Sequence, residues 1–188
     1  MPRTKWRDHI DSVGIVVPCG RLKVVDDDGV EVPRGTPGEL WNGAPMVMPG
    51  YWGRADANKS EFIGGFWRSG DIGSMDADGF IRVFDRKKDM INRGGYKVFS
   101  AEVENVIASL DGVLECAIVG RDDPVLGQRV HAIVVVPDTS SLTAGKVQEF
   151  CAERLADYKV PEIVNLRVTP LPRNANGKIL KSELRETT

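Results

Sequence analysis

A change in hydrophobic period near residues 85–89 constrains the fold of this chain more than any other feature. Before it, glycine and proline recur every few residues between Pro18 and Gly53, with short apolar runs between them. Asp28-Gly29 and Asp78-Gly79 are sequence signals of β-hairpins. We therefore expect residues 10–85 to form short strands in a small barrel-like or meander unit.

From Ser100 onward the apolar residues follow a helical period. Ser100 is placed to cap one helix and Thr143 a second, and a short helix is expected near Ile179–Arg185. Apolar residues at i, i+3, i+4 and i+7 mark the face of the first helix: Val103, Val106, Ile107 and Leu110. Three apolar stretches predict strands: Cys116–Val119, Val130–Val136 and Val164–Val168. Their alternation with helices indicates a small α/β (α+β) domain with a three-stranded sheet and flanking helices.

Composition excludes several classes of function. The 188 residues carry a formal net charge of −2, so no global charge points to nucleic acid or an anionic membrane. No apolar run reaches the length of a transmembrane segment, and residues 1–9 contain no apolar signal-peptide core. The three cysteines have no CxxC spacing, which argues against a disulfide framework or a zinc site. We expect a cytoplasmic protein without a resident metal.

A basic segment lies at the change of period. Between Arg82 and Lys97, six basic residues accompany only two acidic ones, beside Gly94-Gly95. Such a segment suits a phosphate ester, because glycine backbone N–H groups can approach an anion closely. On composition alone, a solvated charged loop is the favoured interpretation. The Gly-Lys pairs at 145–146 and 177–178 lack the rest of a P-loop.

Four motifs occur in the order and spacing found in the adenylate-forming (AMP-binding) superfamily. The stretches are Trp67–Asp71, Asp85–Ile91 with the following Gly94-Gly95 and Glu102–Glu104, Leu155–Pro161, and Pro172–Ile179. They resemble the signatures of acyl-CoA synthetases, luciferases and peptide-synthetase adenylation domains, apart from Asn174, where threonine is usual. The run 89–98 looks more like bacterial acyl-CoA synthetases than like peptide-synthetase domains, which implies a fatty-acid–CoA ligase.

The resemblance assigns roles to three polar residues. Asp71 and Arg86 would bind the nucleotide, with the Asp71 carboxylate accepting hydrogen bonds from the ribose hydroxyls. Lys178 would be catalytic and would stabilise the charge at the α-phosphate during adenylation. Without the resemblance, Asp71 reads as a turn residue, Arg86 as a member of a surface ion pair with Asp85 or Asp89, and Lys178 as a solvated lysine.

The same resemblance assigns a hinge and a channel. Lys88 aligns with the family's hinge position, and Gly94, Gly95 and Tyr96 resemble the loop that lines the coenzyme A channel. An exposed lysine and a plain tight turn are the alternatives. Residues 1–86 would then be the last β-rich subdomain of the family's large N-terminal region, and residues 87–188 its mobile C-terminal domain.

The implied activity joins a carboxylic acid to coenzyme A. The acid attacks the α-phosphate of ATP to give an acyl-adenylate and pyrophosphate, and the thiol of coenzyme A then displaces AMP. The family's phosphate loop and magnesium-binding motif are not found in this sequence, so the expected partner is the N-terminal region of the same enzyme, and the isolated chain is expected to be inactive. The alternatives are an aryl-acid or amino-acid adenylating enzyme, and a non-catalytic module that binds another protein.

Overall fold

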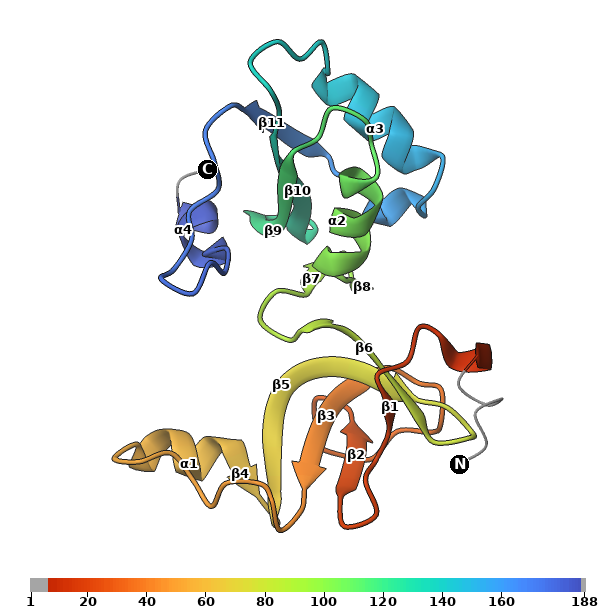
Figure 1. Ribbon diagram of the computed structural model, residues 1–188, viewed down its shortest axis with the longest axis vertical. Helices are drawn as coiled ribbons and strands as arrows, with labels where there is room; N and C mark the ends of the chain where they lie inside the picture. Colours follow the sequence, from red (N-terminus) through yellow and green to blue (C-terminus); the bar gives the residue numbers. More distant parts are fainter. Residues whose placement is uncertain (1–6, 187–188) are drawn as a thin grey trace. The chain divides into compact units, whose positions relative to one another are not determined.

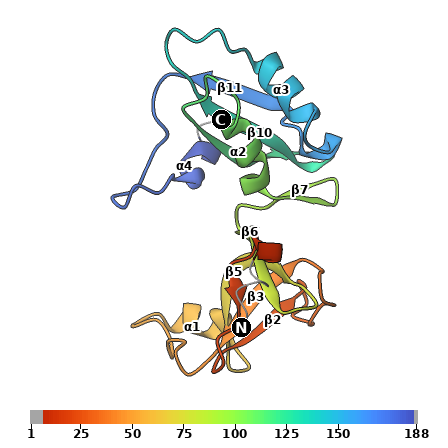
Figure 2. The ribbon, with the colours of Figure 1, turned by 45° about the vertical axis from the view of Figure 1, so that its right-hand side comes forward.

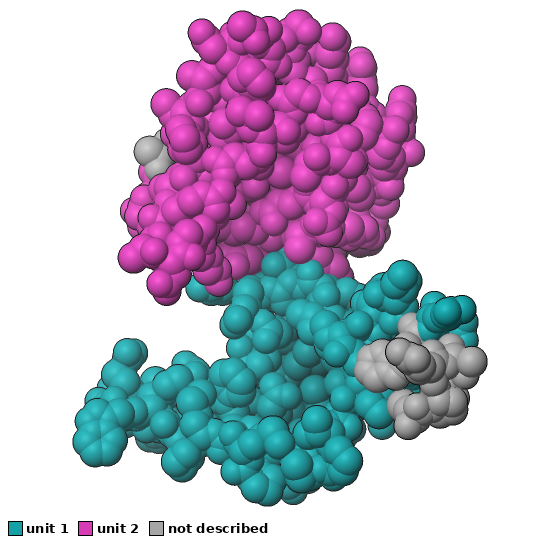
Figure 3. Space-filling model, in the orientation of Figure 1, with its two compact units in different colours: residues 1–88 teal, residues 89–188 magenta. Residues whose placement is uncertain are grey.

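The computed structural model describes residues 7–186. The chain divides into two compact units, residues 1–88 (unit 1) and residues 89–188 (unit 2), coloured separately in Figure 3. The expectation about a signal peptide falls largely on residues 1–6, outside the described residues. Between residues 7 and 186, no helix combines the length and the hydrophobicity needed to cross a membrane.

Unit 1 is a sheet in which a long central strand pairs on both sides. Its strands are β1 (Gly14–Ile15), β2 (Arg21–Val25), β3 (Gly38–Gly43), β4 (Phe62–Ile63), β5 (Phe66–Met75) and β6 (Phe80–Arg86). The order is β1-β6-β5-β3-β2, all antiparallel, and β4 also pairs with β5. A 3₁₀ turn (Arg7–His9) precedes the sheet, and α1 (Ala55–Glu61) lies with β4 to one side of it (Figure 1).

The expected barrel is not confirmed. In the described part of the chain, the path of strands ends at β1 on one side and β2 on the other, so the sheet is open. The Asp78-Gly79 hairpin is present between β5 and β6, where Asp76 Oδ1 accepts the N–H groups of Asp78 and Phe80 at 3.0 and 2.9 Å. After Asp28-Gly29 only a single bridge forms, and β2 pairs with β3 instead.

Unit 2 is a five-stranded sheet with helices on both faces. Its strands are β7 (Ile91–Arg93), β8 (Tyr96–Val98), β9 (Glu115–Asp123), β10 (Gly127–Val135) and β11 (Ile163–Arg167). β10 is the centre, antiparallel to β7 and β9 and parallel to β11. The three predicted strands are β9, β10 and β11. The hairpin of β7 and β8 was not predicted, because three-residue strands in a charged segment show no apolar run.

The helices of unit 2 cover the two faces unequally. They are α2 (Ser100–Ala108), α3 (Ala144–Ala152), a 3₁₀ turn (Asp157–Lys159) and α4 (Lys181–Glu186). Helices α2 and α3 lie on one face and α4 on the other (Figures 1 and 2). The larger core lies under α2 and α3 and includes Val103, Ile107 and Val147, all fully buried. The smaller core lies under α4 and includes Leu184.

One predicted helix cap is confirmed and the other is wrong. The Thr143 hydroxyl accepts the Lys146 N–H at the start of α3. Ser100 is instead the first residue of α2, and Phe99 occupies the cap position. The Ser100 side chain is fully buried, and its hydroxyl accepts a hydrogen bond from Lys181 Nζ at 2.7 Å. This serine therefore links α2 to α4 and does not cap its own helix.

Truncating the core of unit 2 should lower its stability markedly. Ile107 is 0% exposed, so Ile107→Ala removes buried methylene groups and leaves a cavity, with an expected loss of about 2–5 kcal/mol in the free energy of unfolding. Urea unfolding followed by far-ultraviolet circular dichroism measures this loss. Val125→Ala is the matched control, because Val125 is 85% exposed, and should change stability by less than about 0.5 kcal/mol.

Candidate functional site

Two of the sequence-predicted site residues meet in unit 1. Asp71 on β5 stands directly opposite Arg86 on β6 in the antiparallel register. Arg86 Nε lies 2.8 Å from Asp71 Oδ1, and the two side chains are 50% and 29% exposed. Arg86 Nη1 also donates to the Ser69 carbonyl at 3.3 Å. The ion-pair partner of Arg86 is thus Asp71, and not the neighbouring acidic residues considered from sequence.

The backbone that carries Asp71 is fixed by buried hydrogen bonds. The buried Ser69 hydroxyl donates to the Leu40 carbonyl at 2.8 Å and accepts the Asp71 N–H at 3.0 Å. Gly70 has φ of +71°, a conformation that L side chains rarely adopt. Its carbonyl accepts the Lys87 N–H at 2.7 Å. These bonds set the direction in which the Asp71 carboxylate points.

A buried carboxylate on β3, the strand next to β5, was not predicted from the sequence. Glu39 on β3 is 4% exposed, and its Oε2 lies 3.2 Å from both Arg68 Nη2 and Lys87 Nζ. Lys87 Nζ also lies 3.0 Å from Asp27 Oδ1. Burial opposes ionisation of Glu39, but the hydrogen bonds from Arg68 and Lys87 hold its pKa below the ordinary value. The sequence holds no local signal for this burial, because Arg68 and Lys87 lie 29 and 48 residues away from Glu39.

The pocket beside the pair is polar. It encloses about 490 Å³. Side chains of both charges line it, together with the turn at Gly70: Glu39, Ser60, Glu61, Arg68, Ser69, Gly70, Arg86, Lys87 and Lys88. Such a lining suits a ligand with hydroxyl groups and negative charge better than an apolar one.

The basic segment is less open to anions than its composition suggested. At least four of its six cations form ion pairs with carboxylates: Arg82 with Asp11 and Asp76, Arg86 with Asp71, Lys87 with Glu39 and Asp27, and Arg93 with Glu162. Much of the local positive charge is therefore neutralised within each unit. The segment is part of the fold on both sides of the unit boundary and is not a loop of solvated lysines and arginines.

Lys178 lies at the end of a tight loop in unit 2. Arg173 and Ile179 form a bridge across the loop, and Asn174 Oδ1 accepts the N–H groups of Asn176 and Lys178 at 3.0 and 2.9 Å. Asparagine thus serves the turn at the position where the resemblance has threonine. The Lys178 side chain is exposed, and no carboxylate among residues 7–186 forms an ion pair with its ammonium group.

Gly94 and Gly95 form the two-residue turn of the β7–β8 hairpin. Both have positive φ, +58° and +88°, as a type I′ turn requires. The Gly94 N–H donates to the Leu126 carbonyl at 2.7 Å. Tyr96 is 58% exposed and stacks on Tyr158 with ring centroids 4.6 Å apart. The geometry accounts for both glycines as turn residues, and leaves one face of Tyr96 accessible.

Lys88 is exposed and is the last residue of unit 1. The next residue, Asp89, is 8% exposed and pairs with Arg185 at 2.8 Å within unit 2. The chain is therefore anchored in different units on the two sides of Lys88.

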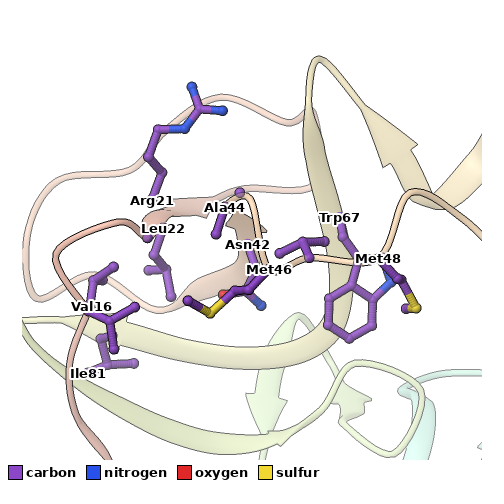
Figure 4. A pocket seen from close by; sticks show the side chains of 13 residues that line it. Val16, Arg21, Leu22, Asn42, Ala44, Met46, Met48, Trp67 and Ile81 are labelled. Carbon is purple, nitrogen blue, oxygen red and sulfur yellow. The ribbon is translucent and has the colours of Figure 1, made fainter.

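A second pocket in unit 1 is apolar (Figure 4). It encloses about 500 Å³. Its lining comes from four separate stretches of chain and includes Val16, Leu22, Met46, Met48, Trp67 and Ile81. The Trp67 ring contributes one wall, and its Nε1 donates to the Tyr51 hydroxyl at 3.1 Å. This pocket could not be predicted from the sequence, because its lining residues lie far apart in the chain and are brought together only by the order of the strands.

The described residues contain three free cysteines and no cluster of metal-ligating side chains. Between residues 7 and 186, no group of three His, Cys, Asp or Glu side chains is placed to hold a metal ion. All three cysteines are free, and only Cys19 is exposed. Burial raises the pKa of Cys116 to about 12 and that of Cys151 to about 11, so both stay protonated thiols.

Two protein-family models match different parts of this chain. Residues 2–52 match the AMP-binding enzyme family, and residues 102–178 match the AMP-binding enzyme C-terminal domain. A long-chain-fatty-acid–CoA ligase from Yersinia pestis is 45% identical over 96% of this chain, and a feruloyl-CoA synthase from an Amycolatopsis species is 38% identical over 98% of it. The alignments cover 32% and 38% of those proteins, so the chain spans about a third of their length.

Solved structures give the same result. An o-succinylbenzoate CoA synthetase from Bacillus subtilis, in complex with an acyl-adenylate intermediate, superposes with a TM-score of 0.89 at 33% identity. The match covers 98% of this chain and 37% of that protein. ATP-bound MatB from Rhodopseudomonas palustris superposes with a TM-score of 0.85 at 35% identity, over 94% of this chain and 35% of MatB.

Acid should weaken unit 1 through Glu39. Because the folded-state pKa of Glu39 is lowered, its ion pairs stabilise unit 1 above the ordinary value of 4.5, and this stabilisation is lost as pH falls through the folded-state pKa. All four tryptophans lie in residues 1–88, so tryptophan fluorescence follows the unfolding of unit 1. The stability gap between the wild type and Glu39→Gln should shrink from pH 7 to pH 3; an unchanged gap would contradict this.

Only one cysteine should react in the folded protein. Treatment with iodoacetamide at pH 8 should alkylate Cys19, because its thiol is exposed, and spare Cys116 and Cys151, whose thiols are buried and protonated. Mass spectrometry of peptides counts the modified residues, and the urea-unfolded chain, in which all three should react, is the control. Rapid native labelling of Cys151 would show that unit 2 opens more readily than its core implies.

Proposed function

This chain belongs to the family of AMP-binding enzymes, and on that premise we propose that it is the C-terminal part of an ATP-dependent acyl-CoA ligase. The reaction converts a carboxylic acid, ATP and coenzyme A into an acyl-CoA, AMP and pyrophosphate by way of an acyl-adenylate. The observation that carries the proposal is the pairing of Asp71 with Arg86 beside a polar pocket. The domain matches on both sides of that pair support it.

Asp71 and Arg86 are proposed to bind the ribose. A carboxylate can accept hydrogen bonds from two neighbouring hydroxyl groups, and a guanidinium offers several donors in a fixed plane. The ion pair between them is partly exposed, and such pairs contribute only about 0–1 kcal/mol. A nucleotide can therefore replace this contact at little cost, while the hydrogen bonds of Ser69 and Gly70 keep the backbone in place.

Lys178 is proposed to act in the first half-reaction. There the acid's oxygen forms a bond to the α-phosphorus, and the bond from that phosphorus to the oxygen of the leaving pyrophosphate breaks. Negative charge grows on the α-phosphate oxygens, and an ammonium placed beside them lowers the barrier. An exposed lysine without an ion-pair partner among the described residues is available for this role, and the short loop from Arg173 to Ile179 limits its backbone freedom.

The remaining proposals concern the movement of the C-terminal domain and the coenzyme A channel. Residues 1–86 are proposed to be the last subdomain of the large N-terminal region, and residues 87–188 to contain the domain that rotates between half-reactions. With the hinge at Lys88, Lys87 stays with unit 1 during the rotation, and unit 1 ends at Lys88. Gly94, Gly95 and Tyr96 are proposed to line the coenzyme A channel, where a glycine turn lets a thin pantetheine arm pass the backbone. Three unpaired cysteines favour a reducing compartment, the cytoplasm.

A fatty acid is the proposed acid substrate. Support comes from the name and 45% identity of the Yersinia pestis relative and from the similarity of residues 89–98 to bacterial acyl-CoA synthetases. An aryl acid is the second candidate, favoured by the 38% identity to a feruloyl-CoA synthase. A non-catalytic module would instead bind a full-length ligase in stoichiometric amounts without changing its rate.

The complete reaction is proposed to need the family's larger N-terminal region, which carries the acid pocket, the phosphate loop and the magnesium ligands. The described residues offer no cluster that fits Mg²⁺, so no step is assigned to a metal on this chain. We expect the chain alone to show no ATP–pyrophosphate exchange.

Lys178→Ala tests the catalytic assignment. The chain is mixed with a separately produced N-terminal region of a related ligase, and ATP–pyrophosphate exchange is measured with magnesium and a panel of fatty and aromatic acids. Exchange should appear on mixing, and Lys178→Ala should lower it by about 10²–10³-fold, the loss typical of one removed electrostatic contact in a transition state. Lys146→Ala is the matched control, because Lys146 is also an exposed lysine of unit 2.

Two results would contradict the proposal. Exchange by the chain alone, lost in Lys178→Ala, would mean that it holds a complete adenylation site. Equal exchange by Lys178→Ala and Lys146→Ala would remove the catalytic role of Lys178. The acid that supports the fastest exchange decides between the fatty-acid and aryl-acid candidates.

A further inference from the structure

A buried glutamate in unit 1 connects the two segments that carry the nucleotide site. Glu39 is 4% exposed on β3, and a carboxylate is almost never buried to this extent without cationic partners. One partner is Arg68, within the stretch Trp67–Asp71, and the other is Lys87, within the stretch Asp85–Ile91. Both cations approach the same oxygen, Oε2, at 3.2 Å.

Lys87 is held to unit 1 at three points. Its Nζ contacts Glu39 and also Asp27, at 3.2 and 3.0 Å. Its backbone N–H donates to the Gly70 carbonyl at 2.7 Å, one residue beyond the Asp71–Arg86 pair of the β5–β6 ladder. The Lys87 side chain is thus held by the loop between β2 and β3 and by β3 itself. Its backbone is held by β5 of the same unit.

The boundary between the two units follows Lys88. Lys88 is exposed and closes unit 1, and Asp89 is buried in unit 2 through its pair with Arg185. A hinge needs a residue whose φ and ψ change while its neighbours stay attached to their own bodies. The contacts of Lys87 and Asp89 supply such attachments on the two sides of Lys88.

We propose that Glu39 is a positioning residue that clamps Lys87 to unit 1 and thereby fixes the start of the interdomain hinge at Lys88. This inference rests on the proposed hinge role of Lys88. The same contact also prevents the backbone change at the hinge from extending to Arg86. Asp71 and Arg86 therefore stay paired when unit 2 rotates. Without Glu39, the flexible joint extends back along β6 and includes the nucleotide-binding arginine.

A merely structural role for Glu39 makes a different prediction. Loss of a buried ion pair lowers the stability of the whole unit, but it leaves the pattern of backbone order along a folded chain unchanged. The clamp instead changes that pattern at two adjacent residues. Local backbone order at Arg86 and Lys87 is therefore the quantity that separates the two roles.

Nitrogen-15 relaxation of the full chain measures this order residue by residue. In the wild type, order parameters of about 0.85 should extend through Lys87 and fall only at Lys88. In Glu39→Gln, the neutral amide cannot hold two cations, and the values at Arg86 and Lys87 should fall below about 0.6. Glu31→Gln, a change at an exposed glutamate of the same unit, should leave the wild-type pattern intact.

A second variant covers the case in which Glu39→Gln does not fold. Lys87→Gln removes the clamped cation at a half-buried position, and should lower the order parameter of residue 87 in the same way. Asp27→Asn, which removes only the more exposed partner of Lys87, should leave Lys87 ordered because Glu39 remains.

Rigid values at Arg86 and Lys87 in folded Glu39→Gln or Lys87→Gln would overturn the clamp. Low wild-type values that begin before Lys87 would do the same. The measurement uses no nucleotide, so it is independent of the adenylation test. Loss of exchange in the mixed enzyme with an intact relaxation pattern would count against the proposed function alone.

Discussion

The antiparallel register of β5 and β6 determines whether unit 1 has a site, because a slip of one residue would turn Asp71 and Arg86 to opposite faces of the sheet. Several contacts fix this register. The Asp76 carboxylate closes the turn at one end, and the Lys87 N–H meets the Gly70 carbonyl at the other. Between them the ladder shifts at Ile72–Gly73, where a side chain on Gly73 would collide with the Arg82 carbonyl.

Two carboxylates of unit 1, Asp71 and Glu39, differ in how strongly their cationic partners hold them. The Asp71–Arg86 pair is partly exposed and weakly held, so a ligand can compete for both side chains. The carboxylate of Glu39 is buried between two cations, and removal of one partner would leave an uncompensated charge, which is costly. A ligand can therefore replace the contact between Asp71 and Arg86, whereas the contacts of Glu39 are suited to stabilising the fold of unit 1.

Much of unit 2 was predictable from the sequence, and much of unit 1 was not. The period of apolar residues located α2, α3, β9, β10 and β11, because each packs an apolar face against the core. Strand signals in unit 1 predicted strands but not whether the sheet closes, since closure depends on strand order, which a period of two does not encode. The cap predicted at Ser100 failed because a helix start depends on backbone angles that Phe99 adopts instead.

The candidate site shows the same limit. The resemblance singled out Asp71 and Arg86 separately, and only the fold shows that they touch. Glu39 was not predicted because its partners lie 29 and 48 residues away in the sequence. The residues next to a buried charge in the sequence do not show that it is buried. The glycines at 94 and 95 were recognised as a turn or a channel, and the hairpin geometry accounts for the turn.

A titration of the nitrogen-15-labelled chain with millimolar AMP, compared with 2′,3′-dideoxy-AMP, tests the central claim most directly. AMP should shift the amide signals of Gly70, Asp71 and Arg86, and the analogue without ribose hydroxyls should leave them in place. Equal shifts with both nucleotides, or shifts by AMP that spare these three residues, would contradict the assignment of Asp71 and Arg86 to the ribose.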